Sequence, residues 1–167
     1  EEIDADYLNF EIKDAAELPS IIAQHPTLRG INVTIPHKQA VIALLDEIDE
    51  DAATIGAVNT VRVKDGRLKG YNTDWIGFSE SIKPLLKPCH TKALILGTGG
   101  ASKAVVYALN KMGIETMTVS RRAQAGILTY ADLTPEVMDK YKVIVNCSPV
   151  GMFPHIDVSP EIPYRNL

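Results

Sequence analysis

A glycine-rich stretch constrains the fold of this chain more than any other feature. Residues 97–102 read Gly-Thr-Gly-Gly-Ala-Ser and follow an almost continuous apolar run at residues 92–97. Such a run is typical of a strand that is buried on both faces of a parallel sheet. The pattern predicts a helix after the glycines, ending near Met112, and a second strand at residues 115–120. Strand, glycine turn, helix and strand in this order predict one βαβ unit of an open parallel sheet.

The glycine-rich stretch has the G-x-G-x-x-small form at the position where dinucleotide-binding proteins carry it. Glycines there let the backbone turn tightly and approach a pyrophosphate, whose charge is met by amide groups at the helix N-terminus. A glycine turn that binds nothing is the competing interpretation, and the flanking strand and helix argue against it. Ser102 stands in place of the third glycine. We therefore expect helix and strand to lie slightly further apart than in the standard motif.

The end of the second predicted strand indicates which dinucleotide fits. An NAD-binding protein carries a carboxylate there, roughly 20 residues after the glycines, to bind the ribose hydroxyls. This chain instead has Ser120, Arg121 and Arg122. Two guanidinium groups can bind a 2′-phosphate with forked hydrogen bonds and stack on adenine. Two arginines after an edge strand, taken alone, are more simply solvated surface charge, but beside the glycine turn they favour NADP over NAD.

The rest of the chain predicts an α/β protein with two unlike halves. Outside the βαβ unit we expect strands at 7–12, 29–34 and 142–147 and helices at 15–24, 74–82 and 135–140. A further helix is expected to begin near Pro36, and its apolar stripe consists of Val41, Leu44, Leu45 and Ile48. The segments 57–63 and 67–71 are expected to form a hairpin that turns at Gly66. We expect an N-terminal α/β domain over residues 1–86. A Rossmann-type parallel-sheet domain follows over residues 87–167, and both domains are expected to be incomplete.

Polar side chains cluster at the predicted strand ends of the first half. They are Asn32 and Thr34, then Asn59 and Thr60, then Asn72, Thr73 and Asp74. Each Asn-Thr pair, on its own, is more simply a turn or a helix cap. Lys38 is harder to explain in that way, because a cation in the first turn of a helix opposes the helix dipole unless an anion or a developing oxyanion lies nearby. Together these groups suit a small polyhydroxylated acid.

Charge and hydropathy patterns exclude several classes of partner. The formal net charge is −4, and no basic run is long enough to bind a nucleic-acid backbone. No apolar stretch approaches the roughly 20 residues that cross a bilayer. The four histidines are too far apart for a local metal site. We expect a small-molecule substrate, no nucleic acid or membrane as a partner, no bound metal and a cytoplasmic location.

Four motifs follow one another between residues 32 and 101, within a stretch from about Leu28 to Met152 that covers most of the chain. They are NVTIPHK at residues 32–38, IGAVNT at 55–60, GYNTDWIG at 70–77 and the GTGGA turn. In this order they resemble the shikimate dehydrogenase family. The resemblance implies a two-domain enzyme that reversibly reduces 3-dehydroshikimate to shikimate with NADPH, in the pathway to the aromatic amino acids.

The resemblance also implies roles for individual residues. Lys38 and Asp74 would be the catalytic pair, and Thr34 and Asn59 would help to bind the substrate. The residues that would hold NADP are Gly97, Gly99, Gly100 and Ala101 at the pyrophosphate, and Ser120, Arg121 and Arg122 at the 2′-phosphate. The chemistry agrees, because a protonated lysine can supply the proton that a ketone oxygen needs when hydride reaches its carbon.

The sequence departs from the family's pattern at both ends. Family members open with a strand and a Ser-x-Ser motif and close with further Rossmann strands and a C-terminal helix, and these parts have no counterpart in the sequence. We therefore expect a fragment or part of a longer chain, with strand edges that could pair two copies into a homodimer. The open alternatives are an NAD-dependent quinate/shikimate dehydrogenase, a non-catalytic dinucleotide-binding fragment, and a structural remnant that binds neither compound.

Overall fold

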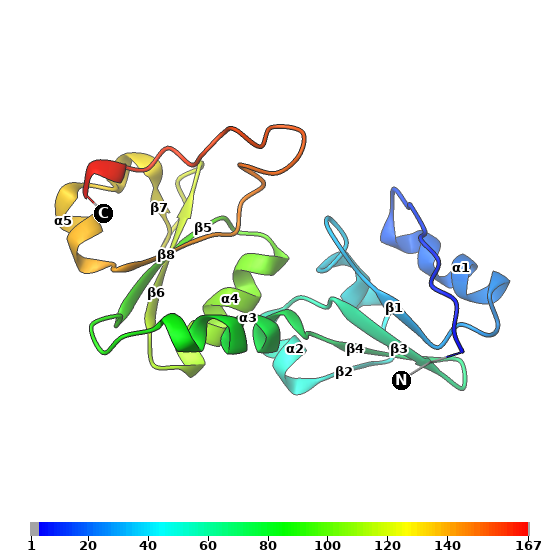
Figure 1. Ribbon diagram of the computed structural model, residues 1–167. Coiled ribbons are helices and arrows are strands. Elements are labelled where there is room, and N and C mark those ends of the chain that lie inside the picture. The colour runs from blue at the N-terminus through cyan, green and yellow to red at the C-terminus, as the bar shows by residue number, and fades with distance from the viewer. Residues whose placement is uncertain (1–3, 167) are drawn as a thin grey trace.

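Two four-stranded sheets organise the chain in the computed structural model, which describes residues 4–166 (Figure 1). The first sheet has the order β1-β3-β4-β2, with strands Gly30–Asn32, Thr60–Lys64, Arg67–Tyr71 and Glu47–Ile48. Strands β1 and β4 are both antiparallel to β3, whereas β2 runs parallel to β4. Helices α1 (Leu18–Gln24) and α2 (Glu50–Ile55) belong to the same lobe. The predicted N-terminal α/β architecture is confirmed.

The predicted hairpin of β3 and β4 is also confirmed, and its turn sets the register of the site. Asp65 and Gly66 both have positive φ, 51° and 75°, as a two-residue type I′ turn requires. The resulting register pairs Thr60 with Tyr71. The segments that follow β4 and precede β3 therefore lie side by side, and the Asn59 amide donates to the Tyr71 carbonyl at 3.1 Å.

The second sheet is entirely parallel, as the glycine unit predicts. Its order is β7-β6-β5-β8, with strands Leu128–Thr129, Glu115–Ser120, Lys92–Leu96 and Val143–Asn146. The helices of this lobe are α3 (Asp74–Ile82), α4 (Gly100–Lys111) and α5 (Pro135–Lys140). Within residues 4–166, no helix is both long and apolar enough to cross a lipid bilayer.

Strand β5 lies at the centre of the second lobe and is buried on both faces. Ala93 and Ile95 pack in one apolar cluster with α4, and Leu94 and Leu96 pack in another with α5 residues. These four side chains are at most 1% exposed. A continuous apolar strand thus becomes the middle layer of a three-layer Rossmann-type domain, which confirms the predicted fold class.

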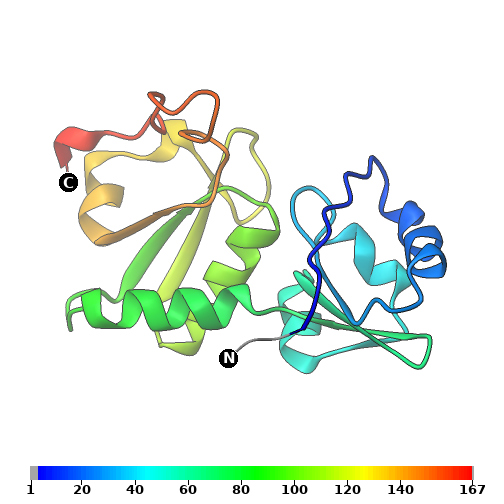
Figure 2. The ribbon, with the colours of Figure 1, turned by 45° about the vertical axis from the view of Figure 1, so that its right-hand side comes forward.

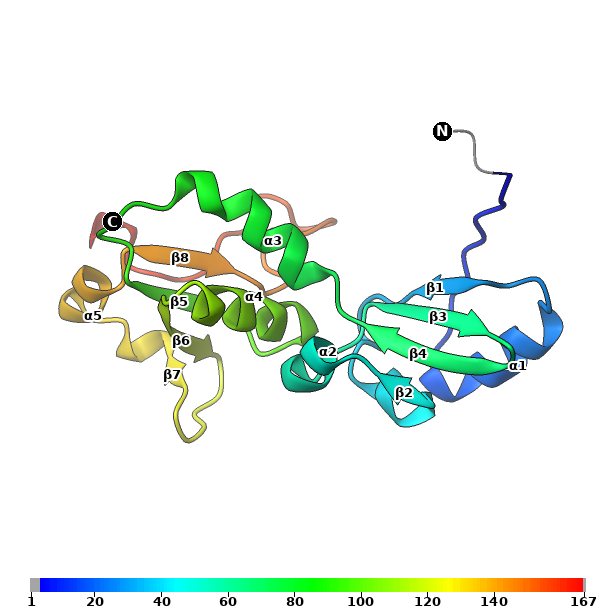
Figure 3. The same cartoon turned by 90° about the horizontal axis from the view of Figure 1, so that it is seen from below.

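The two lobes meet where α2 of the first lobe contacts α4 of the second, and α3 runs beside α4 (Figure 3). Ile55, Ala57 and Ala104 are buried there, with Trp75 and Tyr107 packed against them. Small residues at this contact let α2 and α4 approach each other closely. The expected domain boundary after residue 86 stays a prediction, since α3 precedes it yet packs against α4 of the second lobe.

The strand predicted at residues 7–12 is wrong. Residues 4–12 form neither helix nor strand, and Tyr7 is 74% exposed. The alternating pattern shows only which side chains could face a core, whereas a strand also needs a neighbour for its backbone hydrogen bonds. Side-chain contacts hold the segment instead: Asn32 bonds to the Tyr7 hydroxyl, His37 bonds to the Ile12 carbonyl, and the Phe10 ring packs edge-on against His25.

The long helix predicted after Pro36 is wrong as well. A short 3₁₀ helix, η2 (Ala40–Leu44), is followed by Leu45 and Asp46 and then by β2. The chain leaves the helical path because Asp46 binds the neighbouring strand: its amide donates to the Leu68 carbonyl at 3.0 Å, and its carboxylate accepts from the Leu68 amide at 2.6 Å. The four stripe residues all still pack in the first core, Val41, Leu44, Leu45 and Ile48. The burial of these four side chains was predictable from the apolar spacing, but the secondary structure that carries them was not.

Helix α2 and strand β7 have no counterpart among the predicted elements. A signal for α2 is present in the sequence, because Asp49 caps the helix by accepting from the Asp51 amide at 3.1 Å, and Glu50 and Asp51 lie in its first turn. Strand β7 has only two residues. A run that short carries no periodicity that could be read from the sequence.

Candidate active site

Lys38 and Asp74 meet at the junction of the two lobes. The Lys38 Nζ donates to Asp74 Oδ2 at 2.6 Å, and the two side chains are 16% and 34% exposed. Asp74 opens α3, where the helix dipole favours a carboxylate. The expectation that Lys38 lies in the first turn of a helix is wrong, since it precedes η2 in a turn. The structure nevertheless brings the two predicted residues together.

Asn59 joins this pair and orients the carboxylate. Its Nδ2 donates to Asp74 Oδ1 at 2.8 Å and to Thr73 Oγ1 at 2.9 Å, while its Oδ1 accepts from the Thr73 amide at 2.8 Å. Each oxygen of Asp74 therefore has its own donor, one from Lys38 and one from Asn59. A carboxylate held at both oxygens has little freedom to rotate away from the lysine.

The glycine turn follows β5 and is tied to the end of β6. The Gly97 amide donates to the Val119 carbonyl at 2.9 Å, and Gly97 has a φ of 125° that favours glycine. Gly99 precedes α4 in an extended conformation, and Ala101 lies in the helix's first turn. Among residues 4–166, no heavy atom lies within 4 Å of a Cβ built at Gly99. The backbone at Gly99 is thus open to a ligand.

The glycine turn and the Lys38–Asp74 pair are immediate neighbours. A Cβ built at Gly100 would lie 3.1 Å from Lys38 Cβ and 3.5 Å from Ala57 Cβ. The absence of a side chain at Gly100 lets α4 begin against the first lobe. Figure 2 shows the segment after β1 facing the start of α4. A pyrophosphate at the turn and a carbonyl group at Lys38 would therefore share one junction.

Ser120, Arg121 and Arg122 lie where the sequence predicts them, at the end of β6. This strand pairs with β5 in parallel register, so its end lies at the same sheet edge as the glycine turn. The Arg122 amide donates to Ser120 Oγ at 3.2 Å, and both arginines are exposed. Tyr130 lies near Arg121: burial raises the pKa of Tyr130, and the arginine's charge acts in the opposite direction.

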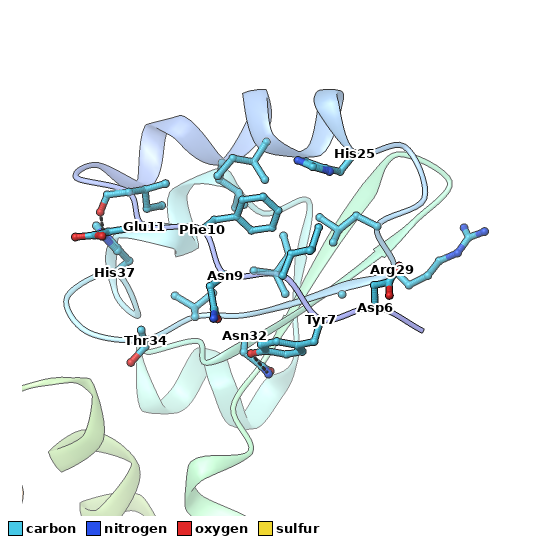
Figure 4. A pocket seen from close by; sticks show the side chains of 18 of the residues that line it. Asp6, Tyr7, Asn9, Phe10, Glu11, His25, Arg29, Asn32, Thr34 and His37 are labelled. Atoms are coloured by element: carbon cyan, nitrogen blue, oxygen red, sulfur yellow. Dashed lines mark hydrogen bonds between the residues drawn. The ribbon is translucent and has the colours of Figure 1, made fainter. Parts of the chain in front are cut away.

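Thr34 follows Val33, whose amide donates to the Asn59 carbonyl at 2.7 Å, and Thr34 also lines a cavity of about 790 Å³ (Figure 4). Residues 4–12, α1, β1 and His37 also line this cavity, whereas Lys38, Asn59 and Asp74 do not. We place the candidate active site at the junction and not in this cavity, because the reduction of a carbonyl needs the proton donor that the junction provides.

Two sets of polar contacts between the lobes were not predicted from the sequence. Lys103 Nζ on α4 donates to Gln39 Oε1 at 2.9 Å. Asp51 on α2 accepts from the Tyr107 hydroxyl and from Lys111 Nζ, and these two hydrogen bonds lower the pKa of Asp51. The partners are more than 50 positions apart, so no local spacing could have indicated them.

Cys147 follows β8, and its carbonyl lies 3.0 Å from the position of a Cβ built at Gly97. Burial raises the pKa of its thiol from 9.0 to about 11. Since the thiolate is the reactive form, we expect Cys147 to react about a hundredfold more slowly at pH 8 than a thiol with the ordinary pKa. Labelling with a disulfide reagent, followed by peptide mapping, should modify the exposed Cys89 first. Equal labelling of both cysteines at pH 8 would contradict the expectation, and the Cys147 rate should rise as the pH approaches 11.

A mixed sheet, followed by a parallel sheet with a glycine turn after β5, defines a two-domain α/β protein with a Rossmann-type second domain. Residues 1–61 match the family model described as the shikimate dehydrogenase substrate binding domain. The shikimate dehydrogenase (NADP(+)) of Aquifex aeolicus strain VF5 is 43% identical over 170 residues, which cover 96% of this chain and 62% of that protein. The resemblance to the shikimate dehydrogenase family is confirmed, and this chain is homologous to its members over nearly its whole length.

Solved structures of the family have the same architecture. The crystal structure of shikimate dehydrogenase from Aquifex aeolicus superposes with a TM-score of 0.78 at 37% identity, covering 91% of this chain and 60% of that one. Shikimate 5-dehydrogenase from Thermus thermophilus, in complex with NADP(H) and shikimate, gives 0.75 at 34% identity, covering 90% and 59%. The chain thus spans less than two thirds of the length of these relatives.

Proposed function

We propose that this chain catalyses the reversible NADPH-dependent reduction of 3-dehydroshikimate to shikimate. One observation carries the proposal: the Lys38–Asp74 pair, 2.6 Å apart, lies against the start of α4, where the glycine turn ends. Homologues named NADP-dependent shikimate dehydrogenases support the choice of substrate and cofactor.

The residues around the glycine turn fit NADPH, which supplies a hydride to the substrate's carbonyl carbon when bound. The open backbone at Gly99 and the first amides of α4, from Gly100 and Ala101, suit a pyrophosphate. The exposed Arg121 and Arg122 would bind the 2′-phosphate, beside Ser120.

Lys38 supplies the proton in the proposed reaction. Negative charge develops on the ketone oxygen as hydride reaches the adjacent carbon, and the Lys38 ammonium donates its proton to that oxygen. Asp74 holds the ammonium in place, and Asn59 holds Asp74. In the reverse direction the neutral amine accepts the proton of the alcohol. Thr34 and Asn59 are proposed to bind the substrate.

Absorbance of reduced nicotinamide tests this function directly. The purified chain is mixed with shikimate and either NADP or NAD, and we expect reduction of NADP in proportion to both shikimate and protein. Saturable NADPH binding without any shikimate-dependent reduction would contradict the proposal and favour a non-catalytic dinucleotide-binding fragment. Faster reduction of NAD would favour the NAD-dependent alternative.

Arg121→Ala is expected to weaken NADPH binding by about tenfold to a hundredfold while NADH binding changes little. A hydrogen bond to a charged group contributes about 1.5–3 kcal/mol, and only NADPH carries the 2′-phosphate. Titration calorimetry or fluorescence with both cofactors measures the difference. Arg67→Ala is the control, because Arg67 is an exposed arginine that pairs with Glu47 in the first lobe. An equal loss for both cofactors would show that Arg121 does not contact the phosphate.

A cytoplasmic location and a homodimer also remain part of the proposal. Cys89 and Cys147 are both free thiols, which fits a reducing compartment. Strand β8 lies at one edge of the parallel sheet, where a second copy could pair with it. Cell fractionation and sedimentation velocity test the two statements separately.

A further inference from the structure

Asn72 is a buried polar residue at the junction of the lobes. Its exposed fraction is 4%, and it lies between the end of β4 and the start of α3. A buried asparagine is costly unless its amide group is hydrogen-bonded. The two hydrogen-bond partners of the Asn72 side chain therefore indicate its role.

The side chain of Asn72 links two separate segments of the site. Its Oδ1 accepts from the Asp74 amide at 3.0 Å, and its Nδ2 donates to the Ala57 carbonyl at 2.9 Å. The first bond satisfies the amide of the first residue of α3 and so caps this helix. Thr73, which directly precedes α3, makes no capping bond with its side chain. The second bond reaches the segment that precedes β3.

One of the two linked segments carries the proposed proton-donating pair, and the other contacts the helix on the cofactor side. Asp74 carries the carboxylate that holds Lys38. Ala57 is fully buried beside Ala104 of α4, and its Cβ lies 3.5 Å from the position that a Gly100 Cβ would occupy. Ala57 thus forms part of the surface on which the cofactor-side helix begins.

We propose that Asn72 is a positioning residue that fixes the Lys38–Asp74 pair relative to the glycine turn. This inference rests on the proposed function. Hydride and proton must reach adjacent atoms of one carbonyl group, so the spacing between turn and lysine determines the rate. A displacement of about 1 Å in such a geometry can reduce the rate a hundredfold.

Kinetics of Asn72→Ala test the inference against a purely structural role. We expect kcat to fall at least tenfold in folded protein, with KM for NADPH within about twofold of the wild type. Thr134→Ala is the control, since Thr134 caps α5 by accepting from the Val137 amide at 3.4 Å in the second lobe. Asn72→Ala with the same kcat as Thr134→Ala would overturn the inference.

A second measurement does not depend on activity. In ¹H–¹⁵N NMR spectra, Asn72→Ala should shift the amide signals of both Asp74 and Gly100, whereas a simple helix cap would shift that of Asp74 alone. Asn72→Asp covers the case in which the alanine variant does not fold, because it keeps the acceptor for Asp74 and loses the donor to Ala57. Its Gly100 signal should still shift, and an unmoved Gly100 signal in the folded variant overturns the inference.

The two proposals fail in different ways. A wild-type chain that binds NADPH but never reduces NADP with shikimate defeats the proposed function, and the NMR shifts still decide the role of Asn72. An active wild type whose Asn72 variants keep full kcat defeats the positioning role alone.

Discussion

Lys38→Ala should lose most of kcat, by about 10²–10⁴-fold, while the affinity for NADPH stays nearly unchanged. Proton transfer from a positioned side chain contributes a factor of this size. The alanine side chain cannot act as a proton donor. The variant also lacks the cation that lies 2.6 Å from Asp74 Oδ2 in the wild type. The glycine turn belongs to the other lobe, so the cofactor keeps its contacts. Steady-state kinetics and cofactor titration measure the two quantities separately.

Lys92→Ala is the matched control for this variant. Lys92 also forms a close ion pair, with Glu115 at 2.8 Å, but it begins β5 at the end opposite the glycine turn. An exposed ion pair contributes little to stability, so we expect kcat within twofold of the wild type. A turnover of Lys38→Ala that matches Lys92→Ala would remove lysine from the mechanism and leave the pair with a structural role only.

The second lobe was predictable because its signals are local. The apolar run of β5, the glycines that follow and the helix α4 are consecutive in the sequence, and each has a period or composition that only one structure satisfies well. The arginines after β6 needed only one further step, since parallel strands end at the same sheet edge. The βαβ unit therefore agrees with the structure nearly residue by residue.

The site in the first lobe depends on contacts that local patterns do not contain. Lys38 and Asp74 are 36 positions apart, and only the resemblance to a family paired them. The hairpin register explains their approach afterwards, because it brings Asn59 beside the start of α3. The two wrong elements, at residues 7–12 and after Pro36, failed for the same reason: a hydrogen-bonding neighbour, or its absence, overrode the apolar pattern.

The glycine turn allows the requirements of folding and binding to be separated by two neighbouring substitutions. Gly97→Ala should destabilise the fold by about 2–4 kcal/mol, because alanine is strained at a positive φ and its Cβ would collide with backbone. At Gly97 the φ is 125°, and a Cβ would lie 3.0 Å from the Cys147 carbonyl oxygen and 3.2 Å from the Ser148 nitrogen. Urea unfolding followed by fluorescence measures the loss, and an unchanged midpoint would contradict it.

Gly99→Ala should give the opposite result, with a stable fold and weakened cofactor binding. Its φ is −78°, and a Cβ would meet no heavy atom of the described residues within 4 Å, so we expect the substitution to cause no strain in the free protein. The added methyl group would occupy the space through which a pyrophosphate approaches the backbone, and we expect NADPH affinity to fall at least about tenfold. If Gly99→Ala binds NADPH as tightly as the wild type, the pyrophosphate does not lie over this turn. The cofactor would then have to bind elsewhere, and the proximity of Gly100 to Lys38 would no longer support the transfer of hydride and proton to one carbonyl group.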